Sequence, residues 1–392
     1  MAAMEPLLVR EHASAREELA DLVLKLTESS IRLKASLPAP IVSSLADLVR
    51  SMNCYYSNLI EGHDTHPIDI ERALKKDFST DPKQRDLQLE ARAHISVQAW
   101  VDEGGLDGRA TTAEGILEIH QRFCAELPDD LLWVVHKDTD ERERVLPGEY
   151  RQRDVIVGRH IPVSAGALPR FMSRFEESYA KLGKMDAIQA TASAHHRLLW
   201  LHPFIDGNGR VARLMSYAML KELLGTGGLW SIARGLARNE TRYKEHLAAC
   251  DYPRQGDLDG RGNLSERSLV NFTKFWLETC IDQVAFMEGM MEPRGLKNRV
   301  LVWCEEEVLS GMLPARSPKL LELLVLRGDV ARAEVKNVLG VNERTAQRVT
   351  RALQENGIIR SSGQREPWYL AFPATLASRW MPGLFPDRTL VR

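Results

Sequence analysis

Apolar side chains recur at helical spacing along almost the whole 392-residue chain, and no other feature constrains its fold as strongly. The pattern predicts helices over residues 18–33, 41–62, 112–127, 167–182, 185–201 and 210–224. One stretch, Arg153–Pro162, instead alternates apolar and polar side chains around Gly158, which predicts a short β-hairpin. We therefore expect an all-α protein that carries one small β-hairpin.

Composition excludes several classes of protein. The formal net charge of −2 gives no overall bias toward nucleic acid or membrane. The five cysteines are scattered without a CxxC pair, which favours a reducing compartment over a disulfide framework or a zinc site. No stretch approaches the roughly 20 apolar residues that a membrane-spanning helix needs. With no apolar signal region near the start, we expect a cytoplasmic protein that makes no membrane contact.

Changes in pattern divide the chain into four parts. Residues 1–111 read as an N-terminal helical region, and a second helical set that begins at residue 112 and ends near residue 291 reads as the core. Residues 292–316, which contain prolines and glycines, read as a connector. Residues 317–392 read as a separate small domain.

The segment HPFIDGNGRVAR, residues 202–213, carries the chemistry. His202 is its only side chain whose usual pKa lies near neutrality, so it is the natural general base toward a hydroxyl. Asp206 is a hard oxygen ligand of the type that Mg²⁺ prefers beside phosphates. Gly207 and Gly209 let the backbone approach an anion closely, and Asn208 can donate to a phosphate oxygen.

The end of the segment adds positive charge. Arg210 and Arg213 are three residues apart on the following helix, so they share one face and can bind phosphate oxygens. The N-terminus of that helix also favours an anion. An isolated GNG would be only a turn, but the combined set predicts a site for a nucleoside triphosphate and its metal.

This segment resembles the signature of the Fic-domain family, HxFx(D/E)GNGRxxR, at every specified position. The resemblance implies transfer of AMP from ATP to a Tyr, Thr or Ser hydroxyl of a target protein or of the enzyme itself. His202 would deprotonate the hydroxyl and Asp206 would hold Mg²⁺. Asn208 and the amides around Gly207 and Gly209 would bind the α-phosphate region. Arg210 would bind the β-phosphate and Arg213 the γ-phosphate.

An upstream hexapeptide, SNLIEG at residues 57–62, resembles the inhibitory-helix motif (S/T)xxxE(G/N) of many Fic proteins. In that interpretation Glu61 pairs with Arg213 and occupies the γ-phosphate position, and Ser57 holds the same helix. The alternative is that Glu61 is an ordinary solvated carboxylate at a helix end.

The same resemblance assigns a flap and an adenine contact. The predicted hairpin would pair with an extended target segment through Val155, Ile156, Val157, Gly158, Arg159 and His160. The alternative is a hairpin that only covers the core. Tyr243 stands where relatives often place an aromatic ring near adenine, although a packed tyrosine fits the sequence nearly as well.

Residues 317–372 resemble a winged-helix domain. Arg344, Arg348 and Arg351 share a helical face with Gln347 beside them, and such a face could contact DNA. Nine Lys and Arg against six Asp and Glu in this range give only a modest positive charge, so docking of a protein or dimerisation is favoured over DNA binding.

Together these patterns predict an autoinhibited, Mg²⁺-dependent protein adenylyltransferase built on a Fic helical core. Two alternatives stay open. The chain could be a DNA-binding regulator whose core modifies only itself. It could also run the reverse reaction, in which Glu61 positions a water that removes AMP from a modified target. A homodimer is compatible with the sequence.

Overall fold

A computed structural model describes residues 2–9, 13–135 and 140–386. Residues 1 and 387–392, at the ends of the domains expected over 1–111 and 317–392, lie outside the described residues. The α-helices are α1 (Ala13–Ala35), α2 (Ala39–Ile60), α3 (Pro67–Leu74), α4 (Pro82–Asp102), α5 (Ala113–Ala125), α6 (Leu168–Tyr179), α7 (Lys184–Leu201), α8 (Asn208–Leu224), α9 (Ile232–Arg238), α10 (Glu240–Ala249), α11 (Glu266–Met290), α12 (Pro293–Leu309), α13 (Ser317–Arg327), α14 (Val335–Leu339), α15 (Glu343–Glu355) and α16 (Ala377–Trp380). The strands are β1 (Trp133–Val135), β2 (Arg142–Arg144), β3 (Asp329–Val330), β4 (Ile359–Arg360) and β5 (Trp368–Leu370).

The prediction of an all-α fold is confirmed, and the helix ends follow the local sequence. Asp81 caps α4 by accepting a hydrogen bond from the amide of Gln84, and Thr112 caps α5 in the same way. None of the described helices is long and apolar enough to span a membrane.

The helices gather into two compact units. Unit 1 comprises residues 1–30, 53–226 and 231–283, and unit 2 comprises residues 31–52, 227–230 and 284–392. Residues 53–111 therefore belong to the same unit as most of the core that the sequence analysis placed at 112–291.

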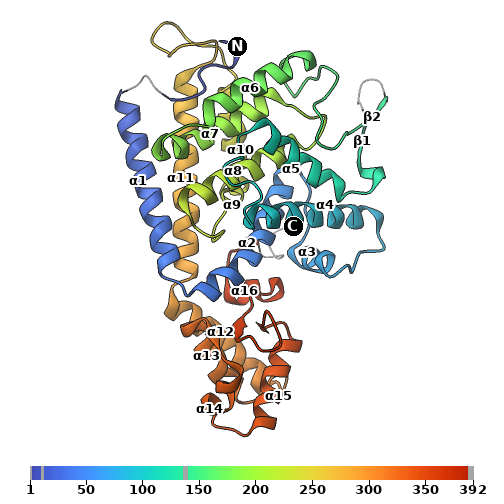
Figure 1. The fold of residues 1–392 in the computed structure, drawn as a ribbon, viewed down its shortest axis with the longest axis vertical. Coiled ribbons are helices and arrows are strands. Elements are labelled where there is room, and N and C mark those ends of the chain that lie inside the picture. Colours follow the sequence, from blue (N-terminus) through green and yellow to red (C-terminus); the bar gives the residue numbers. More distant parts are fainter. Residues whose placement is uncertain (1, 10–12, 136–139, 387–392) are drawn as a thin grey trace. The chain divides into compact units, whose positions relative to one another are not determined.

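In unit 1 the antiparallel helices α7 and α8 pack along each other beneath α5 and α6 (Figure 1). Leu198, Leu201, Leu214 and Met215 from these two helices are buried in one apolar core, to which α5 and α6 also contribute. Helix α8 is buried on nearly all its faces. The loop between α7 and α8 is residues 202–207, so both ends of the predicted catalytic segment are fixed by the core.

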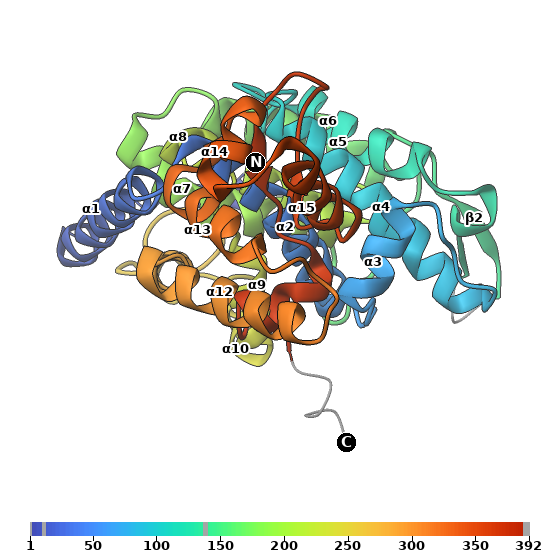
Figure 2. The same ribbon diagram turned by 90° about the horizontal axis from the view of Figure 1, so that it is seen from below.

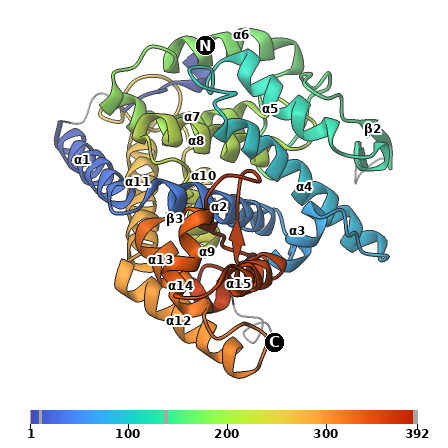
Figure 3. The same ribbon diagram turned by 60° about the horizontal axis from the view of Figure 1, so that its bottom comes forward.

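In unit 2 helices α12 and α13 pack together (Figure 2), followed in sequence by β3, α14, α15, β4 and β5. The strands form an antiparallel sheet in the order β3-β5-β4, in which Asp329 faces Tyr369 and Ile359 faces Leu370. Helices α13, α14 and α15 gather around this sheet (Figure 3).

Residues 292–316 are not an irregular connector, because most of them form α12. Glu292 accepts hydrogen bonds from the amides of Arg294 and Gly295, and Pro293 is in the first turn, where proline favours a helix. Leu296, Val300, Trp303 and Cys304 are the buried face of this helix. This spacing is helical, and the proline that suggested a linker is instead the start signal.

The structure also differs from the β-hairpin that was predicted over Arg153–Pro162. Only Val157 and His160 pair there, as an isolated bridge with N···O distances of 2.9 and 3.0 Å. The carbonyl of Arg153 instead accepts a 2.6 Å hydrogen bond from the guanidinium of Arg151, and Pro162 has no amide to extend a ladder. The regular two-stranded ribbon is β1-β2, upstream of the predicted position.

Candidate active site

His202 lies directly after α7 in a left-handed conformation, with φ +48° and ψ +62°. This conformation is unfavourable for a residue with a side chain, by roughly 1–3 kcal/mol, and occurs mainly at functional sites. Its amide donates to the carbonyl of Leu198 at 3.0 Å, and its own carbonyl accepts a 2.8 Å hydrogen bond from Nε of Arg151. The backbone on which the expected base sits is thus fixed from both sides.

Burial lowers the pKa of His202 to about 4, and the positive charge of Arg151 acts in the same direction. The imidazole is therefore neutral at physiological pH. A neutral ring can accept a proton, which is what the expected general base must do.

Arg151 is a central residue that the sequence analysis did not identify. Its side chain is fully buried and donates to the carbonyls of His202, Arg153 and Val163, while its amide donates to Pro203. One guanidinium thus ties the turn at 157–160 to the loop at 202–207. No local pattern marks this arginine, because its partners are up to 51 residues away in sequence.

The loop itself is braced by Asn208 and Phe204. The Asn208 side chain accepts from the Phe204 amide at 3.0 Å and donates to the Phe204 carbonyl at 2.8 Å. The Phe204 ring is fully buried and stacks on His120 at a centroid distance of 3.9 Å. Gly207, with φ +82°, makes the turn into α8. Asn208, which we expected on a phosphate, therefore holds the loop backbone, and His120 is a support that the sequence did not reveal.

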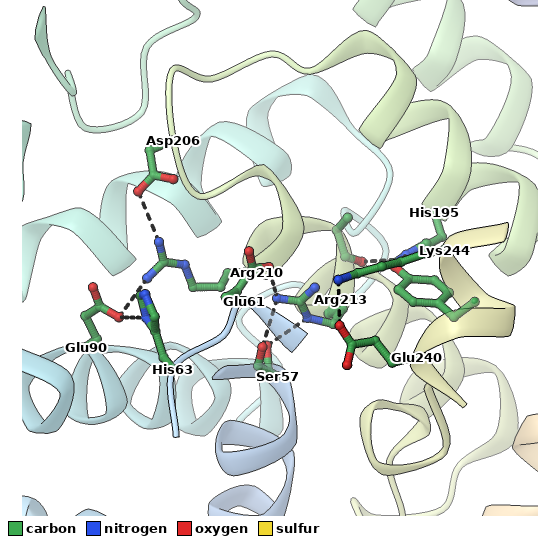
Figure 4. Close-up of polar contacts among 12 residues, drawn as sticks. Ser57, Glu61, His63, Glu90, His195, Asp206, Arg210, Arg213, Glu240 and Lys244 are labelled. Atoms are coloured by element: carbon green, nitrogen blue, oxygen red, sulfur yellow. Dashed lines mark hydrogen bonds and ion pairs between the residues drawn. The ribbon is translucent and has the colours of Figure 1, made fainter. Parts of the chain in front are cut away.

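Arg213 and the inhibitory motif meet directly. Glu61 Oε1 lies 2.5 Å from Arg213 Nη2, and Ser57 accepts from Arg213 through both its hydroxyl (2.8 Å) and its carbonyl (3.2 Å), as Figure 4 shows. The Arg213 side chain is only 3% exposed and that of Glu61 is 34% exposed. Burial opposes ionisation of Glu61, but Arg213 and Arg210 outweigh it and keep the pKa of this carboxyl below its usual value.

The carboxylate of Glu61 also covers Gly209, in the first turn of α8. A Cβ atom on residue 209 would lie 2.3 Å from Glu61 Oε1 and 3.1 Å from Arg213 Nη1. Since the N-terminus of a helix attracts anions, Glu61 occupies the region where an anionic ligand of this loop is expected.

Arg210 faces two other carboxylates (Figure 4). Its Nη2 atom donates to Asp206 at 3.0 Å, and its Nη1 atom lies 3.2 Å from Oε2 of Glu90 on α4. The same Glu90 oxygen is 2.8 Å from Nδ1 of His63. Nε and Nη1 of Arg210 are buried and donate no hydrogen bond within the described part of the chain. Nε of this buried arginine thus has no acceptor in that part of the chain and Nη1 has only the ion pair with Glu90, so the guanidinium can still donate to an anionic ligand.

Asp206 is the one carboxylate of the loop, and its side chain is about half exposed. The described residues contain no group of three or more His, Cys, Asp or Glu side chains arranged to hold a metal ion. Mg²⁺ in nucleotide sites commonly takes one or two protein carboxylates and completes its shell with phosphates and water. A single accessible aspartate beside the anion region fits that kind of site.

The expected adenine contact, Tyr243, and the residues of the expected flap differ in how exposed their side chains are. Tyr243 is buried, and its hydroxyl lies 2.6 Å from Nε2 of His195, which agrees with the packed tyrosine that the sequence left open. In the flap segment Ile156 is strongly exposed, whereas His160 is fixed by a 2.7 Å contact between its Nε2 and the carbonyl of Trp200. The turn at 157–160 is therefore held beside the end of α7, next to His202.

Residues 110–220 match the sequence model of the Fic/DOC family. The chain contains a Fic domain. It is 28% identical over 221 residues to protein adenylyltransferase Fic of Drosophila ananassae, a match that covers 54% of this chain and 41% of the relative. For the Drosophila grimshawi protein of the same name the identity is 29% over 168 residues, which cover 42% and 32% of the two chains. The chain thus spans less than half the length of these curated relatives.

Two solved structures share the fold. A Fic family protein from Desulfovibrio desulfuricans has a TM-score of 0.52 at 16% identity, and the match covers 93% of this chain and 98% of that one. A segment of Fic-1 from C. elegans has a TM-score of 0.50 at 17% identity, with 71% and 75% covered. At these identities the likeness concerns the fold of the Fic domain, and the chemistry must be argued from the site.

Proposed function

We propose that this chain is a protein adenylyltransferase that transfers AMP from ATP to a Tyr, Thr or Ser hydroxyl and is inhibited by its own Glu61. The observation that carries the proposal is the arrangement around α8, where two buried arginines and a glycine-rich turn face carboxylates in place of an anionic ligand. The Fic-domain match and the relatives named protein adenylyltransferase support the type of reaction.

In the proposed reaction the hydroxyl oxygen of the target attacks the α-phosphorus of ATP while neutral His202 takes its proton. The bond between the α-phosphorus and the oxygen that bridges to the β-phosphate breaks, and pyrophosphate leaves with that electron pair. Such a transfer depends on positioning and charge stabilisation. The amides at the start of α8, with Arg210 and Arg213, supply both.

Asp206 would hold the Mg²⁺ that neutralises phosphate charge when bound. Arg210 Nε, which has no hydrogen-bond acceptor within the described residues, and Nη1, which has only the ion pair with Glu90, would then bind phosphate oxygens on the side of the β-phosphate. Arg213 would bind the γ-phosphate once Glu61 leaves it. With Glu61 in place, the triphosphate either does not enter or enters without this contact, and its α-phosphate is misplaced for attack.

The flap would align the target. Ile156 and its neighbours in 155–160 lie beside the end of α7, and the exposed backbone of a turn can pair with an extended segment. His160 is engaged with Trp200, so it contributes to the position of the turn more than to contact with a target. A segment of the same chain or of a second copy would satisfy this arrangement as well as a foreign protein.

The order helix, strand, helix, helix, strand, strand over 317–370 supports a winged-helix domain. Arg344, Gln347, Arg348 and Arg351 on α15 are exposed, and Ala346, Val349 and Leu353 are buried. Arg351 pairs with Glu355, which reduces the charge this face offers to DNA. We therefore propose two roles for this domain, protein docking and DNA binding. Measuring the affinity for duplex DNA at several salt concentrations distinguishes them.

The test compares the wild type, Glu61→Gly and His202→Ala, each incubated with ATP labelled on the α- or the γ-phosphate. We expect α-label on protein from Glu61→Gly, little from the wild type and none from His202→Ala. Glu103→Gly is a matched control, because Glu103 also follows a long helix but is exposed.

The outcomes separate the alternatives. Transfer of γ-label would replace AMP transfer by phosphate transfer. Release of AMP from a labelled target that requires Glu61 would assign the reverse reaction, in which the ionised Glu61 orients a water. Equal labelling by the wild type and Glu61→Gly would remove the proposed brake.

A further inference from the structure

Glu90 on α4 contacts two positive groups of different origin. Its Oε2 atom is 3.2 Å from Arg210 Nη1 and 2.8 Å from His63 Nδ1. Arg210 belongs to the catalytic segment, whereas His63 follows Glu61 by two residues in the turn after α2. One carboxylate therefore joins the phosphate-binding face of α8 to the segment that carries the inhibitory glutamate (Figure 4).

We propose that Glu90 is a positioning residue with two tasks: it orients Arg210 for the triphosphate and, through His63, fixes the turn that presents Glu61 to Arg213. This inference rests on the proposed nucleotide site and adds to it a residue that lies outside the Fic signature. Arg210 needs such support because its side chain is buried and its Nε and Nη1 atoms make no hydrogen bond within the described residues.

The backbone of the turn after α2 is held by hydrogen bonds to the end of the helix. The amide of His63 donates to the carbonyl of Asn58 at 2.9 Å, which closes the helix end, and the residues from His63 to His66 form no helix or strand. The His63–Glu90 contact is a side-chain link from this turn to a neighbouring helix. If it opens, Glu61 keeps its contact with Arg213 but loses part of its fixed position.

The His63–Glu90 contact should depend on pH. The groups that face His63 are Glu90 from α4, Arg210 from α8 and Glu61 from its own turn. The hydrogen bond with Glu90 and the charges of Glu90 and Glu61 raise the pKa of His63, and they outweigh burial and the charge of Arg210, which lower it. Because the pKa is raised, the protonated pair is complete at low pH and is lost as the pH rises through the raised value. Inhibition by Glu61 should therefore weaken toward alkaline pH.

The two tasks are separated by testing each variant in two backgrounds. In the Glu61→Gly background, where the brake is absent, Glu90→Gln should raise KM for ATP by about fivefold with a smaller effect on kcat, since the ion pair between Glu90 and Arg210 is replaced by a neutral contact. His63→Ala should leave both constants unchanged in that background. Glu118→Gln is a matched control, because Glu118 is also paired with two arginines but on α5, away from the loop.

In the wild-type background His63→Ala should raise basal AMP transfer by about fivefold near pH 6, and this ratio should be smaller near pH 8.5, where neutral His63 keeps only the weaker contact of a neutral donor. His63→Gln, which keeps a neutral donor, should restore part of the inhibition without pH dependence. The ratio of variant to wild type at each pH removes the titration of ATP itself. His202, with its pKa lowered to about 4, does not titrate in this range.

Three results would overturn the inference: no effect of His63→Ala on the wild type at either pH, an equal effect in the Glu61→Gly background, or a change in kcat alone for Glu90→Gln. If Glu61→Gly itself shows no transfer, the proposed function fails instead. Binding of a non-hydrolysable ATP analogue with Mg²⁺ then still tests Glu90, because Glu90→Gln should weaken that binding about fivefold while Glu118→Gln should not. Equal binding by the two variants would overturn it.

Discussion

Replacing Glu61 by Gln separates charge from bulk in the proposed inhibition. Glutamine has the shape of glutamate and can still accept a hydrogen bond from Arg213, but it has no negative charge. The native contact is short, at 2.5 Å, and Arg213 is almost fully buried, so the pair acts in a poorly solvated place. If Glu61 inhibits as a rival anion for Arg213, the Gln variant should be substantially released.

The size of the release follows from the contact. A hydrogen bond to a charged group contributes about 1.5–3 kcal/mol and a neutral one about 0.5–1.5 kcal/mol. The two ranges differ by about 1–1.5 kcal/mol. The Glu61 side chain is about one-third exposed, so screening by water reduces the difference, and we take about 0.5–1 kcal/mol. That difference corresponds to an increase of roughly 2- to 5-fold in ATP-dependent labelling at ATP concentrations below KM.

The assay is the initial rate of α-label incorporation by the wild type, Glu61→Gln and Glu61→Gly. The Gly variant, which lacks both charge and bulk, sets the ceiling. Added salt should raise the rate of the wild type relative to Glu61→Gln, because only the ion pair is screened. The electrostatic argument would be refuted if Glu61→Gln incorporated label as slowly as the wild type while Glu61→Gly incorporated it quickly. Glu61 would then act by filling space.

Three further predictions concern the loop and its support. In the Glu61→Gly background the transfer rate should be constant from about pH 6 upward and fall only toward pH 4, because the pKa of His202 is lowered to about 4; a fall centred near pH 6.5 would contradict this. Arg151→Lys should lower the melting temperature and the transfer rate together, because a lysine cannot reach the three carbonyls that Arg151 binds, at a cost of about 2–4 kcal/mol. Thermal unfolding followed by circular dichroism checks the predicted loss of stability in Arg151→Lys, and an unchanged unfolding midpoint would refute it. Asp206→Asn should weaken the dependence of transfer on Mg²⁺ concentration and lower the melting temperature only slightly, because the Asp206 side chain is half exposed and Glu90 remains beside Arg210; a Mg²⁺ titration of the rate shows whether the first part holds.

The parts of the molecule that the sequence could predict are those written in contiguous residues. The helices on each side of the loop follow from spacing that repeats within a few residues, and the site segment lies within twelve positions, from His202 to Arg213. The pairing of Glu61 with Arg213 was expected only because a short motif resembled a known one. No periodicity in the chain connects two positions that are 152 residues apart.

The supports of the site could not be predicted in the same way. Arg151, His120 and Glu90 each act through contacts that depend on how separate helices pack, and each lies in a stretch without an unusual local pattern. The flap was misplaced for a related reason. Alternation of apolar residues predicts a strand only if neighbouring backbone groups are free to pair, and here the guanidinium of Arg151 already binds the carbonyls of Arg153 and Val163.

If Glu61 inhibits as proposed, the two arginines of the loop connect inhibition with stability. Arg210 and Arg213 are both buried, and a buried guanidinium without a counter-charge is strongly destabilising. In the absence of a nucleotide, that charge comes from Glu61 for Arg213 and from Asp206 and Glu90 for Arg210. A triphosphate has to take over at least the contact made by Glu61, so the interaction that stabilises the empty loop is the same one that opposes the substrate. Removing Glu61 should then lower the melting temperature of the free protein, and ATP with Mg²⁺ should restore more of that loss than it adds to the wild type. An equal shift by ATP in both proteins would show that the stability of the loop and its inhibition have separate origins.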